Sequence, residues 1–185
     1  MTLRRAAFLD RDGTIIEDTG FVRDAQGIRL IPGSAEAIRK LNEAGWAVVV
    51  VTNQSGIARG LVSRQEYDAV ARQLDALLAE QGARIDATYM CPHHPDVTGR
   101  CDCRKPGLES YLAAAGRLGI DFTRSVFVGD RMSDVEPAGS LGGRGILVLT
   151  GEGRASREEA ARAAIETADN LSEAIDRQIA RSPDR

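Results

Sequence analysis

An uninterrupted apolar stretch, residues 46–51, constrains the fold more than any other part of the chain. Its sequence is Trp-Ala-Val-Val-Val-Val, and a run of this kind without polar alternation is typical of a strand buried on both faces. Such strands occur mainly in parallel sheets that carry helices on each side. The stretch therefore predicts a strand inside a covered sheet.

Further apolar runs of strand character occur along the chain, and segments with helical features lie between them. We expect strands at residues 6–10, 46–51, 85–90, 125–128 and 145–149. We expect helices at residues 34–44, from Ser63 to Gly82, at 108–118 and from Ser133 to Gly142. This alternation predicts an α/β fold, a three-layer Rossmann-like parallel sheet with helices on both faces.

Two parts of the chain fall outside this alternation. Residues 14–30 are too irregular for a helix and predict a loop or small hairpin that lies over the acids at the end of the first strand. Residues 154–182 are rich in Ala, Glu and Arg and predict a C-terminal helical segment, with a last helix at 171–179 and a tail at 182–185. With 185 residues the chain has the length of a single domain, residues 1–185.

Two serines mark where helices are expected to begin. Ser34 follows a Pro-Gly turn and is predicted to cap the helix that starts there. Ser63 and Glu66 have the spacing of a capping box, in which each side chain accepts a hydrogen bond from the backbone N–H of the other residue. These signals predict the starts of two helices.

Ser133 and Glu136 repeat the spacing of the capping box and predict another capped helix. Pro137 then falls in the first turn, where proline is tolerated. Asp134 and Glu136 are interpreted as acids favoured by the positive end of the helix dipole and not as catalysts.

Polar residues gather at the ends of the predicted strands. Asp10 and Asp12 follow the first strand, Thr52 and Asn53 follow the second, and Asp130 follows the fourth. Parallel strands present their carboxyl ends at one edge of the sheet, where α/β folds place their ligands. The convergence favours a functional site at this edge over a set of ordinary acidic turns.

The residue types at this edge suit phosphoryl transfer. Carboxylates such as Asp10 and Asp130 are the oxygen ligands that Mg²⁺ prefers, and a carboxylate can also form an acyl phosphate. Asp12 is positioned to move a proton to a leaving oxygen. Thr52 and Lys105 supply a hydroxyl group and a compact positive charge for the phosphoryl oxygens. The competing interpretations are turn residues for Thr52 and Asp130 and a solvated surface charge for Lys105.

All cysteines and histidines of the chain fall between residues 91 and 103, namely Cys91, His93, His94, Cys101 and Cys103. An odd number of clustered thiols without a secretory segment argues against a disulfide framework and for a metal. Three thiolates and one imidazole complete a closed tetrahedral zinc site of the structural type. The spacing leaves the choice between His93 and His94 open. Reduced thiols in a loop and a redox-active pair are the alternatives.

The remaining composition argues against other classes of partner. The net charge is −3 and the basic residues are scattered, which gives no surface for nucleic acid or an anionic membrane. No apolar run reaches membrane-spanning length, and no secretory segment follows the basic pair near the N-terminus. We therefore expect a cytoplasmic, monomeric protein with no nucleic-acid or membrane partner.

Together these segments resemble a known family. Asp-Arg-Asp-Gly-Thr at residues 10–14, Thr-Asn at 52–53, Lys105 and Gly-Asp at 129–130 resemble the four motifs of haloacid dehalogenase superfamily phosphatases. Three stretches, 50–60, 91–95 and 101–106, are similar to signatures of the D-glycero-D-manno-heptose 1,7-bisphosphate 7-phosphatases within that superfamily. The resemblance covers about residues 6–151.

The resemblance implies a Mg²⁺-dependent phosphatase that removes the 7-phosphate of this bisphosphate through an aspartyl phosphate. It implies that Asp10 is the nucleophile and Asp12 the acid and base. Mg²⁺ would be bound by the carboxylates of Asp10 and Asp130 and by the backbone carbonyl of Asp12. Thr52 and Lys105 would stabilise the transferred phosphoryl group.

The resemblance also implies the haloacid dehalogenase fold with a minimal cap, in which a zinc-bound loop at residues 91–103 takes part of the role of a lid. The implied zinc ligands are Cys91, His93, Cys101 and Cys103. The implied contacts to a small phosphorylated sugar are Asp18, Thr19, Gly20, Phe21, Asn53, Gln54, Ser55, Arg104 and Arg131.

Some departures from the family pattern bear on the substrate. Thr19 stands where some members carry a histidine, and the loop between His93 and Cys101 is short. Histidinol phosphate or another small sugar phosphate is therefore the second hypothesis for the substrate. A zinc-stabilised binding module without catalysis is the hypothesis from a different functional class.

Overall fold

A six-stranded sheet forms the centre of the molecule, and every neighbouring pair of its strands is parallel. The computed structural model describes residues 3–181. The strands lie in the order β3-β2-β1-β4-β5-β6, so the expected parallel α/β sheet is confirmed. Their bounds are β1 Ala6–Leu9, β2 Ala47–Asn53, β3 Ala87–Cys91, β4 Val126–Gly129, β5 Arg144–Val148 and β6 Glu166–Ala168.

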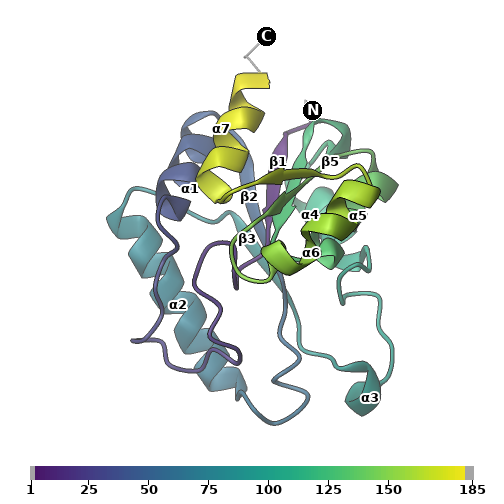
Figure 1. Ribbon diagram of the computed structural model, residues 1–185. Helices are drawn as coiled ribbons and strands as arrows, with labels where there is room; N and C mark the ends of the chain where they lie inside the picture. The colour runs from purple at the N-terminus through teal and green to yellow at the C-terminus, as the bar shows by residue number, and fades with distance from the viewer. Residues whose placement is uncertain (1–2, 182–185) are drawn as a thin grey trace.

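Helices cover both faces of the sheet and give the molecule three layers (Figure 1). One face carries α1, α2 and α7, and the other carries α4, α5 and α6. In the described part of the chain, no helix has both the length and the apolar character needed to span a membrane. The helices are α1 Ser34–Glu43, α2 Arg64–Glu80, α3 Pro95–Thr98, α4 Glu109–Leu118, α5 Met132–Leu141, α6 Gly153–Arg162 and α7 Leu171–Arg181, with a 3₁₀ turn at Phe122–Arg124.

Successive residues of β1 face opposite layers, as the pleat of a strand requires. Leu9 packs in the core that α1, α2 and α7 share. Phe8 packs on the other side, with its ring centroid 5.3 Å from that of Tyr111 in α4 and 4.8 Å from that of Phe127 in β4. Burying a side chain of this size stabilises the folded state by about 1.5–3 kcal/mol relative to leaving it exposed. This packing on both faces fixes the end of β1 and the acidic residues that follow it.

The C-terminal segment differs from the expectation. The sequence predicts a helical segment over residues 154–182, but the strand β6 separates α6 from α7. Only Ala168 of this three-residue strand is buried, so no apolar run marks it in the sequence. The strand depends on parallel pairing with β5, which is a tertiary contact. The helix expected at 171–179 is present as α7, whereas the tail expected at 182–185 lies outside the described residues.

The capping box of Ser63 and Glu66 is confirmed. Ser63 Oγ accepts a hydrogen bond from Glu66 N at 3.1 Å, and Ser63 N donates to Glu66 Oε2 at 2.7 Å. Ser34, in contrast, does not cap α1, because its hydroxyl donates to the carbonyl of Ile15 at 2.9 Å and Gly33 is the capping residue. Ser34 thereby ties the start of α1 to the loop that follows β1.

The second expected capping box is wrong. The helix α5 begins one residue before Ser133, so Asp134 occupies the position that was assigned to Glu136. The carboxylate of Asp134 accepts a hydrogen bond from Arg131 N at 2.9 Å. Pro137 consequently lies inside the helix and not in its first turn. The spacing misleads because an Asp two residues before the Glu performs the same capping.

We predict that Ser63→Ala lowers the free energy of unfolding by about 1 kcal/mol, because two N–H groups at the start of α2 lose the reciprocal arrangement that satisfies them. Urea unfolding monitored by circular dichroism measures the change. Ser156→Ala is the matched control, since it replaces a serine within α6 by a better helix former. Equal stability of Ser63→Ala and the unaltered protein would contradict the prediction.

Candidate active site and metal cluster

The carboxyl ends of β1 and β2 lead into one cavity of about 490 Å³. Asp10 directly follows β1, Thr52 and Asn53 end β2, and Lys105 reaches the cavity from the loop before α4. Asp130 follows β4 and is fully buried. Most of the residues expected at the site line the cavity, namely Asp10, Asp12, Asp18, Gly20, Phe21, Thr52, Asn53, Gln54, Ser55, Arg104, Lys105 and Arg131.

Thr19 is the expected substrate contact that does not line this cavity. It lines a neighbouring hollow of about 290 Å³ instead, and Phe21 borders both spaces. The reason is the local turn, in which Asp18 Oδ1 accepts a hydrogen bond from Gly20 N at 2.8 Å. Asp18 and Gly20 border the main cavity, whereas Thr19 lies on the other side of the turn.

Lys105 forms the charged centre of the cavity floor. Its Nζ lies 2.6 Å from Asp10 Oδ1 and 2.8 Å from Asp134 Oδ1, and it donates to the carbonyl of Val51 at 2.6 Å. Burial lowers the pKa of Lys105, but the two carboxylates outweigh burial and raise the pKa overall. Asn53 holds the lysine backbone, because its Oδ1 accepts from Lys105 N at 3.0 Å and its Nδ2 donates to Lys105 O at 3.2 Å. Lys105 is therefore a fixed, charged group and not a surface lysine.

Three carboxylates, from Asp10, Asp130 and Asp134, each place an oxygen within 4.8 Å of the other two. Burial, and then the charge of Asp10, raises the pKa of Asp130 to about 7. Burial also raises the pKa of Asp134 to about 6, against the lowering effect of Lys105. Asp130 Oδ2 accepts a hydrogen bond from Glu152 N at 2.8 Å, whereas its buried Oδ1 has no hydrogen-bond partner among residues 3–181. This oxygen and the adjacent acids fit a hard divalent cation such as Mg²⁺.

Two glycines allow these acids to approach one another. Gly13 has a φ of +78°, and a Cβ at this position would overlap the carboxylate of Asp130. A Cβ on Gly129 would overlap the side chain of Asp134. Thr150 Oγ1 also donates to the carbonyl of Gly13 at 2.6 Å. Gly13 thus forms a tight turn directly after β1.

Asp12 lies at the side of Thr52 and outside the cluster of three carboxylates. Gln54 Nε2 donates to Asp12 Oδ2 at 2.7 Å and to Thr52 Oγ1 at 2.9 Å, and Arg11 forms a salt bridge with Asp12. Burial raises the pKa of Asp12, while the Arg11 guanidinium opposes the rise. Gln54, expected to contact substrate, uses its amide nitrogen to connect Asp12 with Thr52.

Arginine side chains surround the mouth of the cavity. Arg131 Nη2 lies 3.5 Å from Asp18 Oδ2, and Arg104 Nη1 donates to the carbonyl of His93 at 3.4 Å. The guanidinium of Arg59 lies over the ring of Phe21, 5.4 Å from its centroid. Arg59 also lines the cavity, although it is not among the site residues expected from the sequence. Its place in the polar loop after β2 was the available signal.

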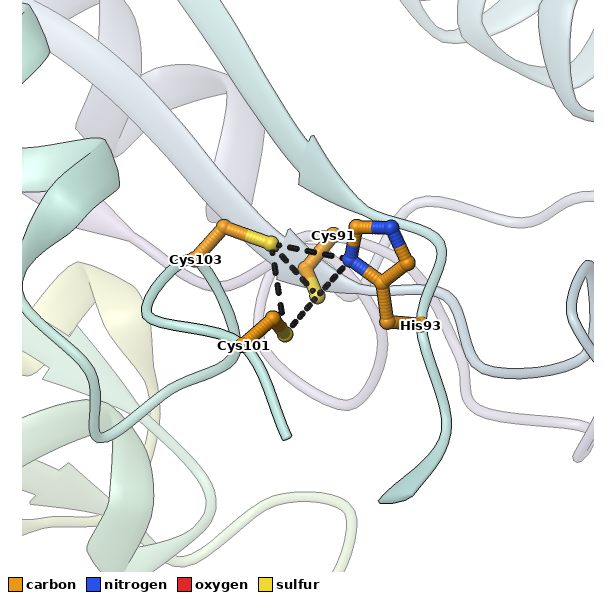
Figure 2. A group of neighbouring side chains, drawn as sticks. All are labelled: Cys91, His93, Cys101 and Cys103. Atoms are coloured by element: carbon orange, nitrogen blue, oxygen red, sulfur yellow. Dashed lines mark hydrogen bonds between the residues drawn. The ribbon is translucent and has the colours of Figure 1, made fainter. Parts of the chain in front are cut away.

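A second cluster lies in the loop that follows β3. The sulfur atoms of Cys91, Cys101 and Cys103 and Nδ1 of His93 face one another (Figure 2), and neighbouring atoms of the cluster lie 3.0 to 3.8 Å apart. These separations exceed the ~2 Å of a disulfide bond. They approach the edge of about 3.8 Å expected for a tetrahedron around zinc with bonds of ~2.3 Å to sulfur. Burial raises the pKa of Cys91 and of Cys103, so a cation is needed for all three thiols to ionise.

The structure separates the two histidines. His93 Nδ1 lies 3.2 Å from Cys103 Sγ. His94 Nδ1 instead accepts a hydrogen bond from Asp96 N at 3.2 Å and caps α3. The cluster is therefore consistent with a zinc site in which His93 is the nitrogen ligand. Its first member, Cys91, is paired with Asn53 in the sheet, which brings the cluster next to the cavity.

Comparison with known proteins identifies the family. A haloacid dehalogenase-like hydrolase model matches residues 7–84, and a HAD-hydrolase-like model matches residues 102–174. The chain is 42% identical over 164 residues to the D-glycero-beta-D-manno-heptose-1,7-bisphosphate 7-phosphatase of Photorhabdus laumondii, covering 86% of this chain and 87% of that protein. It is 39% identical to the Salmonella typhi protein of the same name, over 94% and 96% of the two chains. The chain belongs to the heptose-bisphosphate phosphatase family of haloacid dehalogenase-like hydrolases.

Solved structures agree with this assignment. The D,D-heptose 1,7-bisphosphate phosphatase from B. bronchiseptica, crystallised with magnesium and phosphate, is similar with a TM-score of 0.88 and 34% identity, over 96% of this chain and 99% of that chain. The corresponding protein from Burkholderia thailandensis has a TM-score of 0.68 and 32% identity, over 93% and 96%. The haloacid dehalogenase fold that the motifs imply is confirmed.

Asp134 is the residue of this heptose-bisphosphate phosphatase site for which the sequence predicts only a place at a helix end. It does cap α5, but its carboxylate also binds Lys105 and joins Asp10 and Asp130. The sequence signal that could have placed Asp134 in the site is its spacing from Asp130. Asp130 and Asp134 are separated by one turn from the end of β4 into α5, which brings their carboxylates to the same place.

Proposed function

We propose that this chain hydrolyses the 7-phosphate of D-glycero-D-manno-heptose 1,7-bisphosphate through an aspartyl phosphate on Asp10. The observation that carries the proposal is the contact of 2.6 Å between Asp10 and buried Lys105 on the floor of the cavity. A carboxylate fixed in this way can attack phosphorus, while the ammonium group stabilises the negative phosphoryl oxygens. The choice of sugar is supported by the names of the relatives.

In the first step, Asp10 attacks phosphorus, and the bond between phosphorus and the sugar oxygen breaks. Asp12 gives a proton to that oxygen, so the sugar leaves as an alcohol. Lys105 and Thr52 donate hydrogen bonds to the phosphoryl oxygens. The products of this step are the aspartyl phosphate and the heptose 1-phosphate.

In the second step, water attacks phosphorus of the aspartyl phosphate. Asp12, now ionised, takes a proton from the water, and the bond between phosphorus and the Asp10 oxygen breaks. Inorganic phosphate is released, and both aspartates return to their starting states. One carboxyl group therefore serves as acid and then as base.

Two metals have separate roles in the proposal. Asp10 and Asp130 would hold Mg²⁺ with their carboxylates and Asp12 with its backbone carbonyl, and the bound ion supplies positive charge to the phosphoryl group. A structural Zn²⁺ would order the loop that leads to Arg104 and Lys105. Its proposed ligands are Cys91, His93, Cys101 and Cys103.

The second phosphate of the substrate is proposed to bind among the arginines at the cavity mouth. Among the described residues, no carboxylate pairs with Arg59 or Arg104, whereas Arg131 faces Asp18. Guanidinium groups without a carboxylate partner at the mouth suit a phosphate ester that projects from the sugar.

The monomeric state and the cytoplasmic location stay predictions.

Replacing Asp10 by Asn is predicted to abolish phosphate release, because an amide cannot form the aspartyl phosphate. Turnover of the heptose bisphosphate is measured by phosphate release, and covalent phosphate is sought by intact-protein mass spectrometry. Asp75→Asn, an exposed aspartate on α2, is the matched control. Turnover by Asp10→Asn at the rate of the unaltered enzyme would exclude the covalent route.

Cys101→Ser is predicted to lower the zinc content well below one ion per chain and to reduce the melting temperature, because the loop loses a thiolate ligand. Elemental analysis and differential scanning fluorimetry provide the two measurements. His94→Ala should keep its zinc, since His94 lies outside the cluster. Full zinc occupancy in Cys101→Ser would contradict this ligand set.

Arg59→Met is predicted to raise KM for the heptose 1,7-bisphosphate about tenfold or more, because a charge-assisted hydrogen bond to the second phosphate is lost. Histidinol phosphate and p-nitrophenyl phosphate carry a single phosphate, so their kcat/KM should change little. Steady-state kinetics with the three substrates test this, with Arg72→Met on α2 as the control. An equal loss of kcat/KM on all three substrates would show that Arg59 does not bind the second phosphate.

A further inference from the structure

Arg11 stands between the two catalytic aspartates in sequence, yet it does not line the cavity. Its residue exposure is only 2%. Its guanidinium pairs with the carboxylate of Asp12, with Nε 3.1 Å from Oδ1 and 3.2 Å from Oδ2, and Nη2 2.9 Å from Oδ2. A buried arginine that reaches only the wall of a catalytic cavity is positioned to act through the residue that forms that wall.

The surroundings of Arg11 leave it little freedom to move. The ring of Tyr67 in α2 lies against the guanidinium, with the Arg11 carbon Cζ 5.5 Å from the ring centroid. The backbone carbonyl of Arg11 accepts hydrogen bonds from Ile15 N and Ile16 N at 2.9 and 3.0 Å. Nη1 is buried and has no hydrogen-bond partner in the described part of the chain, which is an energetic cost. Stability alone therefore does not account for an arginine at this position.

The contacts of the Asp12 carboxylate are unequal. Oδ2 accepts hydrogen bonds from Arg11 Nε, Arg11 Nη2 and Gln54 Nε2, whereas Oδ1 accepts, from the residues that the structure describes, only the one from Arg11 Nε. A carboxyl group that exchanges a proton with substrate needs one oxygen with free capacity and the other one held. Oδ1 is the oxygen with that capacity.

We propose that Arg11 is a positioning residue. Its guanidinium binds the Asp12 carboxylate on the side away from the cavity, so that Oδ1 faces the substrate for proton transfer. The inference rests on the proposed function, because it concerns the proton that Asp12 gives to the leaving oxygen. Gln54 holds the same carboxylate from the side of Thr52. Arg11 itself touches neither the phosphoryl group nor the sugar.

The chemistry of the leaving group separates this role from a purely structural one. An alkoxide leaving group of a sugar phosphate needs a proton as the bond to phosphorus breaks, whereas p-nitrophenolate leaves readily without one. For an enzyme that forms an aspartyl phosphate, kcat/KM reports only the steps through the first release of product. A displaced Asp12 should therefore lower kcat/KM for the sugar phosphate and leave that for p-nitrophenyl phosphate nearly unchanged.

The test is Arg11→Met in the full chain loaded with Mg²⁺ and Zn²⁺. We expect kcat/KM for the heptose 1,7-bisphosphate to fall on the order of tenfold to a hundredfold, a fraction of what general acid catalysis contributes. The value for p-nitrophenyl phosphate should stay close to that of the unaltered enzyme. Arg64→Met is the matched control, since Arg64 also lies over Tyr67, at 5.9 Å, but is exposed and pairs with Asp68.

A double-mutant cycle shows whether Arg11 acts through Asp12. Asp12→Asn should reproduce the selective loss on the sugar phosphate, and adding Arg11→Met to it should cause no further loss. A further loss in the double variant, or an equal loss on both substrates in the single one, would overturn the proposal.

Folding of each variant is checked by melting temperature and zinc content. Tyr67→Leu is the second variant in case Arg11→Met does not fold, because it removes the ring that supports the guanidinium and keeps both charged partners. Tyr67→Leu should lower kcat/KM for the heptose 1,7-bisphosphate relative to that for p-nitrophenyl phosphate, by less than Arg11→Met does. An unchanged ratio of the two values would overturn the proposal.

If the unaltered enzyme hydrolyses neither substrate, the proposed function fails. If Asp12→Asn shows the selective loss and Arg11→Met does not, only this inference fails.

Discussion

One buried ammonium group holds together the edge of the sheet on which the site is built. Lys105 Nζ contacts Asp10 after β1, the carbonyl of Val51 in β2, and Asp134 in α5. Without this charge, acids from different elements would repel one another in a space with little water. Asn53 holds the backbone of the lysine through two hydrogen bonds. The zinc-type cluster, β2 and the carboxylates thus form one connected unit.

The features that local chemistry determines could be predicted from the sequence. Residues 47–51 lie in β2, a strand buried on both faces, because they offer no polar side to the solvent. Ser63 and Glu66 satisfy each other within one turn of chain. The cysteines and His93 lie within thirteen residues of one another, so a short loop can bring them together. The motif at residues 10–14 follows directly from a buried strand.

The features that distant contacts determine could not be predicted in this way. The strand β6 exists because β5 offers a free edge, and its own residues carry no strand signal. Asp134 acquires its second role from Lys105, which belongs to another segment. Gln54 lines the cavity as expected, but the contacts of its amide nitrogen with Asp12 and Thr52 depend on the fold. In each case the sequence specifies the side chain, and the fold determines its partner.

The interior position of β1 has a consequence for the order in which the molecule forms. β2 and β3 follow β1 closely along the chain, but its other neighbour, β4, arrives far later: Ala6 N bonds Ser125 Oγ across 119 residues of sequence. A growing chain therefore has β1 as an open, apolar edge until β4 is made, and closing that long loop is entropically slow. Such an edge attracts other strands and favours aggregation. The strand that leads to Asp10 precedes the other strands of the sheet in the sequence, yet one of its edges stays open until β4 has been made.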